Sequence, residues 1–197
     1  MTSSNMSATP APQRIVLIGF MGAGKSTTGR LLASALGWRF VDSDDLIEAR
    51  VGHTIAEIFT TQGEDAFRAL ESEVIRQQCC EQHLVLALGG GAIEHPSTRE
   101  HLHTLPDTHI VYLEAPLDVM VARCLEQPGA AIRPVLADRV RLAHRFTSRI
   151  PHYRTAHLTV ATAHLTPEQV VERILAALGG TPFEPAPSAA GENLPTR

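Results

Sequence analysis

The chain has 197 residues, of which 44% are hydrophobic and 19% are charged, and its formal net charge is −4. This length is enough for one domain with a substantial core, and the slight acidity gives no electrostatic support for a general nucleic-acid-binding role. No apolar run approaches the roughly 20 residues that a membrane span needs. We therefore expect neither nucleic acid nor a membrane among its partners.

The two ends of the chain differ in composition from the rest. Residues 1–13 are polar and rich in Pro and Ala, without the basic-then-apolar order of a secretion signal. Residues 180–197 have a Pro-rich composition that does not form packed elements. We expect a disordered leader, a single domain over residues 14–179 and a disordered tail. The three cysteines, two of them adjacent, make no disulfide framework and favour a reducing, cytoplasmic location.

Between these ends, short apolar runs alternate with helical patterns. Strands are expected at residues 15–18, 38–41, 83–88, 110–113 and 158–160. Helices are expected at residues 31–36, 45–51, 54–62, 64–80, 117–125, 138–148 and 167–178. This alternation predicts an α/β fold with three α/β/α layers, in which helices cover both faces of a five-stranded parallel sheet. Ligands of such sheets bind at the carboxyl ends of the strands.

A glycine-rich motif, Gly19-x-x-x-x-Gly24-Lys25-Ser26, follows the first expected strand and opens a helix. In such a P-loop, glycines let backbone N–H groups surround phosphates, the lysine reaches the β- and γ-phosphates, and the serine hydroxyl can coordinate Mg²⁺. Of the 17 basic residues of the chain, Lys25 is the only lysine. The alternative, a tight turn between strand and helix, would require neither Lys25 nor Ser26. We therefore expect ATP as co-substrate and Mg²⁺ as cofactor.

Two carboxylates follow the second expected strand, at Asp42 and Asp44. Alternate residues of an extended segment project to the same side, so one carboxylate can help to hold Mg²⁺ while the other accepts a proton from an attacking hydroxyl. The alternative is that Asp42, Ser43 or Asp44 simply caps a helix that starts near Asp45. The third expected strand ends without a carboxylate, so Asp42 is the natural metal ligand.

Three glycines in a row, at residues 89–91, follow the third expected strand. Because glycine has no side chain and costs backbone entropy, such a run indicates a close approach to the main chain, although a plain loop is the alternative.

Three arginines stand apart from the main motifs. Arg68 lies among acidic residues, so its simplest interpretation is an ion pair with Glu71 or Asp65. Arg133 lies in a Pro- and Gly-containing stretch where a structural partner is least expected, and Arg149 lies on an expected helix or just beyond it. The sequence by itself does not bring the three together.

Taken in order, these motifs resemble those of the shikimate kinases, a family of small-molecule kinases in the nucleoside-monophosphate-kinase-like P-loop group. The resemblance covers about residues 14–178. It rests on the segments Gly-Phe-Met-Gly-Ala-Gly-Lys-Ser-Thr (19–27), Phe-Val-Asp-Ser-Asp (40–44), Ile-Glu (47–48), Ile-Ala-Glu-Ile-Phe (55–59), Gly-Glu-Asp-Ala-Phe-Arg (63–68), Leu-Gly-Gly-Gly-Ala (88–92), Val-Tyr-Leu (111–113), Arg-Pro (133–134) and Arg-Ile-Pro-His-Tyr-Arg (149–154).

The resemblance implies a P-loop kinase fold with a mobile lid at about residues 127–138. It also implies transfer of the γ-phosphoryl group of ATP to the 3-hydroxyl of shikimate, in the biosynthesis of chorismate and the aromatic amino acids. We expect shikimate and ATP to be its partners and the protein to be a monomer.

Individual roles follow from the same resemblance. Arg68 and Arg149 would clamp the shikimate carboxylate, and Asp44 with the backbone around Gly90 and Gly91 would bind ring hydroxyls. The catalytic residues would be Lys25, Asp44 and Arg133, the last coming from the lid to touch the transferring phosphate. The metal ligands would be Ser26 and Asp42. ATP would be bound by Gly22, Ala23, Gly24, Lys25, Ser26, Thr27, Arg133 and, packed on adenine, Arg123.

Two other functions are compatible with parts of the pattern. A kinase for another polyol acid, such as gluconate, would share the P-loop but would not need the complete set of aspartate, arginine and glycine motifs. A ligand-sensing module with a kinase fold should have lost Lys25 or the aspartates, and both are present.

Overall fold

A single parallel sheet organises the chain. The computed structural model describes residues 12–126 and 138–179. Within them, all sheet neighbours pair in parallel, in the order β2-β3-β1-β4-β5. The strands are β1 (Arg14–Ile18), β2 (Arg39–Asp42), β3 (Leu84–Ala87), β4 (Thr108–Glu114) and β5 (Leu158–Ala161). The five expected strands are thus confirmed, with ends shifted by one or two residues.

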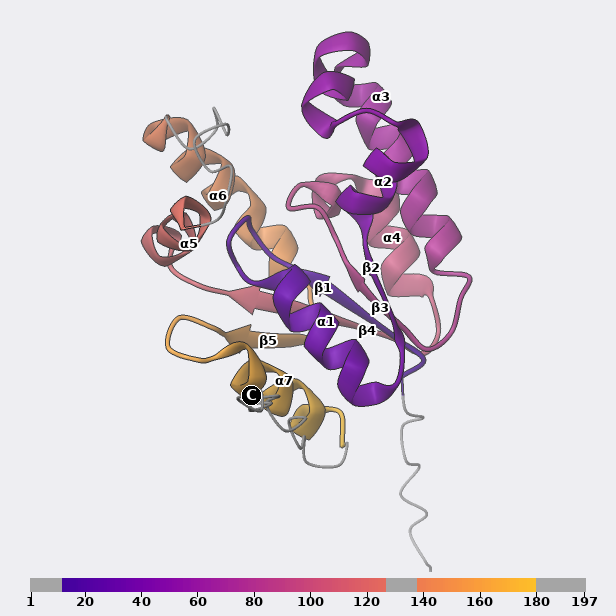
Figure 1. The fold of residues 1–197 in the computed structure, drawn as a ribbon, viewed down its shortest axis with the longest axis vertical. Coiled ribbons are helices and arrows are strands. Elements are labelled where there is room, and N and C mark those ends of the chain that lie inside the picture. The colour runs from indigo at the N-terminus through magenta and orange to yellow at the C-terminus, as the bar shows by residue number, and fades with distance from the viewer. Residues whose placement is uncertain (1–11, 127–137, 180–197) are drawn as a thin grey trace, which may run out of the picture.

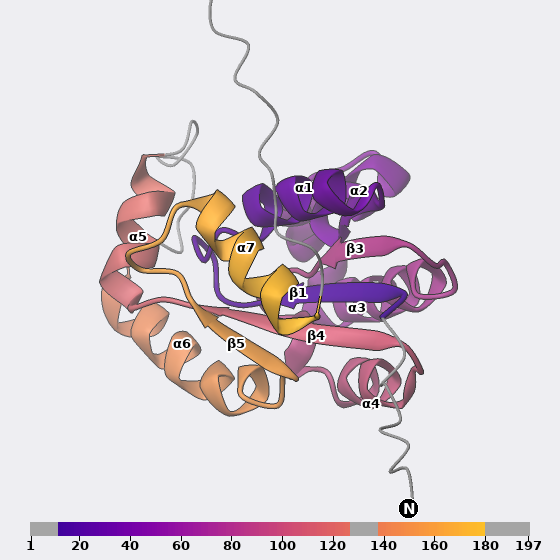
Figure 2. The ribbon, with the colours of Figure 1, turned by 90° about the horizontal axis from the view of Figure 1, so that it is seen from below.

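Helices cover both faces of this sheet. They are α1 (Lys25–Leu36), α2 (Ser43–Val51), α3 (Ile55–Gln78), α4 (Pro96–Thr104), α5 (Leu117–Leu125), α6 (Arg139–Tyr153) and α7 (Pro167–Ala177), with a short 3₁₀ helix η1 (Ala92–Glu94). Figures 1 and 2 show α1 and α7 on one face of the sheet and α4 and α6 on the other. This is the expected three-layer α/β/α arrangement. Across residues 12–126 and 138–179, no helix combines the length and the apolar character needed to cross a membrane.

The main core lies around the central strands. Every residue of β1 and β3 is buried, as expected for strands covered on both faces. A second, smaller apolar cluster joins α2 to α3 through Ile47, Ile58, Phe67 and Val74. Burial of each such side chain contributes about 1.5–3 kcal/mol. This cluster fixes the α2–α3 pair, which projects beyond the sheet at the top of Figure 1.

The expected separation of two helices at Gly63 is a kink within α3. Gly63 has φ 85° and ψ 171°, while the residues on both sides continue as helix. Only glycine adopts such a conformation without strain, so the sequence signal was read correctly.

Two helices and one helix end were not predicted. No helix was expected between β3 and β4, yet η1 and α4 lie there; α4 buries only Thr98 and Leu102, which leaves almost no apolar periodicity to detect. The helix expected to end at residue 148 continues to Tyr153 with Pro151 inside it. Because proline has no N–H, α6 lacks one backbone hydrogen bond at Pro151, and it ends two residues later.

Residues 1–11, 127–137 and 180–197 lie outside the described parts of the chain. The disordered leader, the mobile lid with Arg133 and the disordered tail therefore stay predictions. Asp138, at the edge of the expected lid, caps α6 by accepting a hydrogen bond from the Arg141 N–H at 2.9 Å.

Candidate active site

A cavity of about 640 Å³ opens at the carboxyl ends of the central strands. Its walls come from the P-loop, the α2–α3 pair, the loop after β3 and helix α6. The residues that line it include Ser26, Asp42, Asp44, Phe59, Phe67, Arg68, Glu71, Gly89, Gly90, Gly91, Arg145 and Arg149. The position agrees with the rule that open parallel sheets bind ligands beyond the carboxyl ends of their strands.

The P-loop leads from β1 into α1 and leaves the start of that helix open. Gly24 takes a left-handed conformation with φ 93° at the helix N-cap, and no side chain among the described residues caps the first turn. The free N–H groups and the positive end of the helix dipole therefore form an anion-binding site. Gly22 has φ 74°, and a methyl group there would collide with the Met120 carbonyl oxygen. The loop therefore requires glycine at this position.

Lys25 folds back onto the P-loop. Its Nζ donates hydrogen bonds to the Gly19 and Phe20 carbonyl oxygens at 2.9 Å and 3.1 Å. Burial lowers the pKa of Lys25, although the neighbouring carboxylates of Asp44 and Asp42 oppose this shift. A phosphate that took the place of the carbonyl oxygens would provide the strong negative partner that the buried ammonium lacks.

Asp42 uses its two carboxylate oxygens for two purposes. Oδ1 accepts a hydrogen bond from the Asp44 N–H at 3.1 Å and so caps α2, while Oδ2 accepts one from the Ser26 hydroxyl at 2.6 Å. The capping interpretation of this motif is therefore right for Asp42, and it coexists with an oxygen turned to the P-loop.

The structure corrects the expected position of Asp44. Alternation along a strand predicts an extended segment up to Asp44, but β2 ends at Asp42 and Asp44 lies in the first turn of α2. Both carboxylates still line the cavity. Asp44 Oδ1 is buried without a hydrogen-bond partner among the described residues. Burial, followed by the charge of Asp42, raises the pKa of Asp44 to about 6.

The three glycines after β3 make room for charged side chains. A methyl group on Gly89 would collide with Asp44 Oδ1 and would lie 2.7 Å from Glu71 Oε1. A methyl group on Gly91 would collide with the Arg68 guanidinium and would lie 2.9 Å from an Arg149 nitrogen. The expectation of a close approach to this backbone is therefore right, and the plain-loop alternative is wrong.

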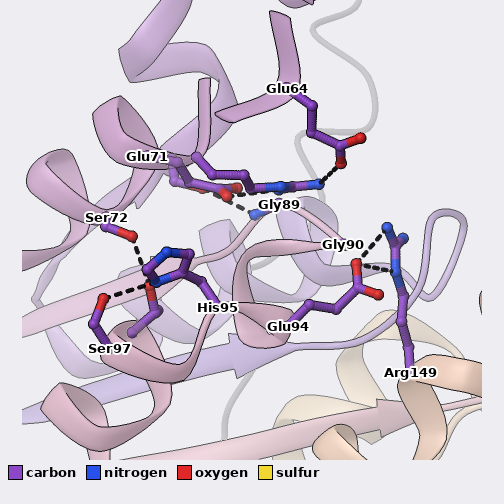
Figure 3. Close-up of polar contacts among 12 residues, drawn as sticks. Glu64, Glu71, Ser72, Gly89, Gly90, Glu94, His95, Ser97 and Arg149 are labelled. Carbon is purple, nitrogen blue, oxygen red and sulfur yellow. Dashed lines mark hydrogen bonds and ion pairs between the residues drawn. The ribbon is translucent and has the colours of Figure 1, made fainter. Parts of the chain in front are cut away.

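Arg68 and Arg149 thus meet at Gly91 from different elements, one from α3 and the other from α6. Arg68 pairs with Glu71 at 2.6 Å and Glu64 at 3.3 Å, so the predicted partner Glu71 is confirmed and the alternative Asp65 is not. Arg149 pairs with Glu94 of η1 at 2.8 Å, and Figure 3 shows these two side chains facing each other.

Four residues that contribute to the site were not predicted. Glu71 was expected only as an ion-pair partner, yet its side chain is 2% exposed and Oε1 has no partner among the described residues. Glu94 orients Arg149. The Ser43 hydroxyl accepts from the Gly89 N–H at 2.9 Å, and the Tyr153 hydroxyl donates to the Gly90 carbonyl oxygen at 2.5 Å. The Arg68–Glu71 pair is local, but no local signal in the sequence marks the other three contacts, because each of them joins segments far apart in the chain.

Glu71 gives the site a testable pH dependence. Burial raises its pKa from 4.5 to about 7, against the opposing charge of Arg68. The folded state therefore holds the proton more tightly than the unfolded state, and stability is lost as the pH rises from the unfolded toward the folded pKa. In Glu71→Gln, we expect the melting temperature to fall less between about pH 5 and pH 8 than in the wild type.

Glu64→Gln is the matched control for this experiment. Glu64 also pairs with Arg68, but its side chain is 61% exposed. Its replacement should leave the pH dependence of the melting temperature as in the wild type. Parallel curves for Glu71→Gln and the wild type would contradict the assignment.

Arg123 lies apart from this cavity. It extends from α5 and donates to the Thr162 carbonyl oxygen at 2.7 Å and the Thr162 hydroxyl at 3.2 Å, just beyond the end of β5. The residue is therefore at the same edge of the sheet as the P-loop, but it is held by protein groups.

A family model described as shikimate kinase matches residues 21–179. The chain belongs to the shikimate kinase family. The shikimate kinase of Mycobacterium avium (strain 104) is 44% identical over 174 residues, which cover 85% of this chain and 94% of that protein. The resemblance inferred from the motifs is thereby confirmed.

Solved structures of the family agree with the fold. The shikimate kinase from Acinetobacter baumannii, in complex with shikimate, has a TM-score of 0.77 and 37% identity, over 86% of this chain and 94% of that one. A gluconokinase from Sinorhizobium meliloti 1021 has a TM-score of 0.58 at 21% identity, which shows a shared fold alone. The expected P-loop kinase fold is therefore confirmed, and the chain is an ATP-dependent kinase of the shikimate kinase family.

Proposed function

We propose that this chain transfers the γ-phosphoryl group of ATP to the 3-hydroxyl of shikimate, giving shikimate 3-phosphate and ADP on the route to chorismate and the aromatic amino acids. The observation that carries the proposal is the cavity itself. Two arginines from separate helices meet at Gly91, and Asp44, next to Gly89, and P-loop residues line the same cavity. A substrate that carries both a carboxylate and hydroxyl groups matches this arrangement.

The phosphate end would be formed by the P-loop. Backbone N–H groups of residues 22–27 and the start of α1 would hold the phosphates, and Lys25 would bridge the β- and γ-phosphates. Arg123 would pack on adenine, which is consistent with its position beyond β5. Arg133, in residues 127–137, would reach the transferring phosphoryl group from a lid.

The residues fit Mg²⁺. Ser26 and Asp42 offer a hydroxyl and a carboxylate oxygen, hydrogen-bonded at 2.6 Å, on the cavity wall. These are the oxygen ligands that Mg²⁺ prefers, and it usually keeps several waters besides. When bound, the ion would neutralise part of the charge on the β- and γ-phosphates.

The substrate end would be formed by both arginines and Asp44. Planar guanidinium groups suit a carboxylate, and Asp44 would accept a hydrogen bond from a ring hydroxyl and orient it for attack. The backbone around Gly90 and Gly91 would complete the binding of the ring. The aromatic side chains Phe59 and Phe67 line the same cavity and would exclude water from the ring. We further propose a monomeric, cytoplasmic enzyme that binds neither nucleic acid nor membranes.

The two arginines should bind the substrate and not the nucleotide. We expect Arg68→Ala and Arg149→Ala each to weaken shikimate binding by about 1.5–3 kcal/mol, the range for a hydrogen bond to a charged group. ATP affinity should change little. Titration calorimetry with each ligand measures both quantities. A loss of ATP affinity with normal shikimate affinity would show that the arginines are misassigned.

The reaction itself is tested by ADP release from ATP and Mg²⁺ with either shikimate or gluconate as acceptor. We expect rapid release with shikimate and none above background with gluconate. Preference for gluconate would support the alternative polyol-acid kinase, and binding of shikimate without ADP release would support a ligand sensor.

A further inference from the structure

We infer that Arg145 is a third substrate-binding cation of the cavity, which raises the affinity for a carboxylate-bearing substrate above the level that Arg68 and Arg149 provide. The inference rests on the proposed function, because it concerns the same substrate. It begins with the balance of charges at the end of the cavity where the two arginines meet.

The two arginines at that end already have carboxyl groups as partners. Arg68 lies 2.6 Å from Glu71 and 3.3 Å from Glu64, and Arg149 lies 2.8 Å from Glu94. Each of the two cations is therefore paired with at least one carboxyl group, although burial raises the pKa of one of these, Glu71, to about 7. A substrate carboxylate adds one more negative charge in a partly desolvated place, where Coulomb interactions are stronger than in water. Further positive charge is needed for tight binding.

Arg145 is placed to supply this charge. It lines the same cavity, half-buried, and it precedes Arg149 by one turn of α6. Residues four apart on a helix share a face, so both side chains are presented to the same ligand. Within residues 12–126 and 138–179, Arg145 has no ion-pair partner. The intervening segment, residues 127–137, contains neither Asp nor Glu.

The contrast with the other two arginines is the basis of the assignment. Arg68 and Arg149 are held in place by carboxylates, which orients their guanidinium groups but cancels much of their charge. Arg145 has the opposite character, because no carboxylate of residues 12–126 and 138–179 pairs with it. Arg68 and Arg149 therefore orient the substrate carboxylate, while Arg145 supplies the net electrostatic attraction to it.

The experiment compares an acid with its uncharged ester. For Arg145→Gln, we measure kcat/KM for shikimate and for shikimate methyl ester. We expect a loss of about five- to twentyfold for shikimate, which is the scale of one partly exposed charge pair, and a change within about twofold for the ester. The KM for ATP should be unchanged, and Arg145→Lys should retain most of the wild-type preference for the acid.

Arg141→Gln is the matched control. Arg141 lies one turn earlier on α6, is exposed and is not part of the cavity wall. This substitution removes the same charge as Arg145→Gln. An equal effect of the two substitutions would mean that Arg145 acts only through the net charge of the protein, and the inference would be overturned. Equal losses for acid and ester, a loss confined to ATP, or no loss would overturn it as well. Melting temperatures confirm that each variant is folded.

Failure of the proposed function would be seen separately, in the wild type. If the wild-type protein released no ADP with shikimate, the reaction would be wrong, whatever the variants did. Calorimetric binding of shikimate to the wild type and to Arg145→Gln would still measure the cation directly. Equal affinities for the acid would then reject the role of Arg145.

Discussion

Replacing Lys25 with Met is expected to slow turnover about 10²–10³-fold, the usual effect of losing one preorganised charge donor. Lys25 Nζ donates hydrogen bonds to the Gly19 and Phe20 carbonyl oxygens, and burial lowers its pKa. The ammonium group thus lies beside the proposed phosphate site and is partly dehydrated. Charge that develops on the transferring phosphoryl group would be stabilised without reorganisation of solvent.

Arginine is expected to substitute poorly at this position. Lys25→Arg keeps the charge, but a planar guanidinium group does not fit where a compact ammonium group bends back onto its own loop. We expect it to be nearly as slow as Lys25→Met. Coupled ADP release measures the rates, and ADP affinity with the melting temperature shows whether the P-loop is intact. Turnover near the wild-type rate in Lys25→Met would contradict the P-loop mechanism.

Local motifs are the part of this site that the sequence predicts well. Gly24, Lys25 and Ser26 are contiguous, and their positions follow from one strand, one turn and one helix start. The kink at Gly63 is likewise predictable, because a single residue determines it. In these cases the information needed lies within a few residues.

Contacts between distant segments are the part of the site that the sequence does not predict. Arg68 and Arg149 meet only because α3 and α6 flank the same three glycines. Glu71 is buried against Gly89 in the loop after β3, so its raised pKa could not be read from an acid three residues after an arginine. The family resemblance supplied the pairing of the two arginines, but the residues that hold them in place required the structure.

Misplaced boundaries have a different origin, in competing local signals. Asp42 is both the last residue of β2 and the cap of α2. The helix therefore begins at Ser43, one residue before Asp44, the second of the two carboxylates. Alternation along a strand therefore did not apply to Asp44. The two carboxylates nevertheless reach one cavity, because the first turn of a helix that starts at a strand end stays close to that end.

Substitutions of the two aspartates, Asp44 and Asp42, are expected to have different effects. Asp44→Asn should weaken shikimate binding and slow phosphoryl transfer by about 10²-fold or more, within the range for a general base. The Asp44 carboxylate is buried, and Oδ1 has no partner among the described residues, so it is free to accept a hydrogen bond from a substrate hydroxyl. Because the transition state of phosphoryl transfer is loose, orientation of that hydroxyl should matter more than removal of its proton.

Asp42→Asn should produce the opposite pattern. Asn is as good a helix N-cap as Asp, so α2 should remain in place while the carboxylate that faces Ser26 is lost. We expect a higher Mg²⁺ concentration to be needed for the half-maximal rate. A higher Mg²⁺ concentration should also be needed for half of the increase in ATP affinity that Mg²⁺ causes. Shikimate affinity should stay largely intact. Titrations of Mg²⁺ and of shikimate on both variants distinguish the two residues. If both variants gave the same pair of curves, Asp42 and Asp44 would act as one unit, because a residue that only binds metal and one that only orients substrate cannot respond alike to both ligands.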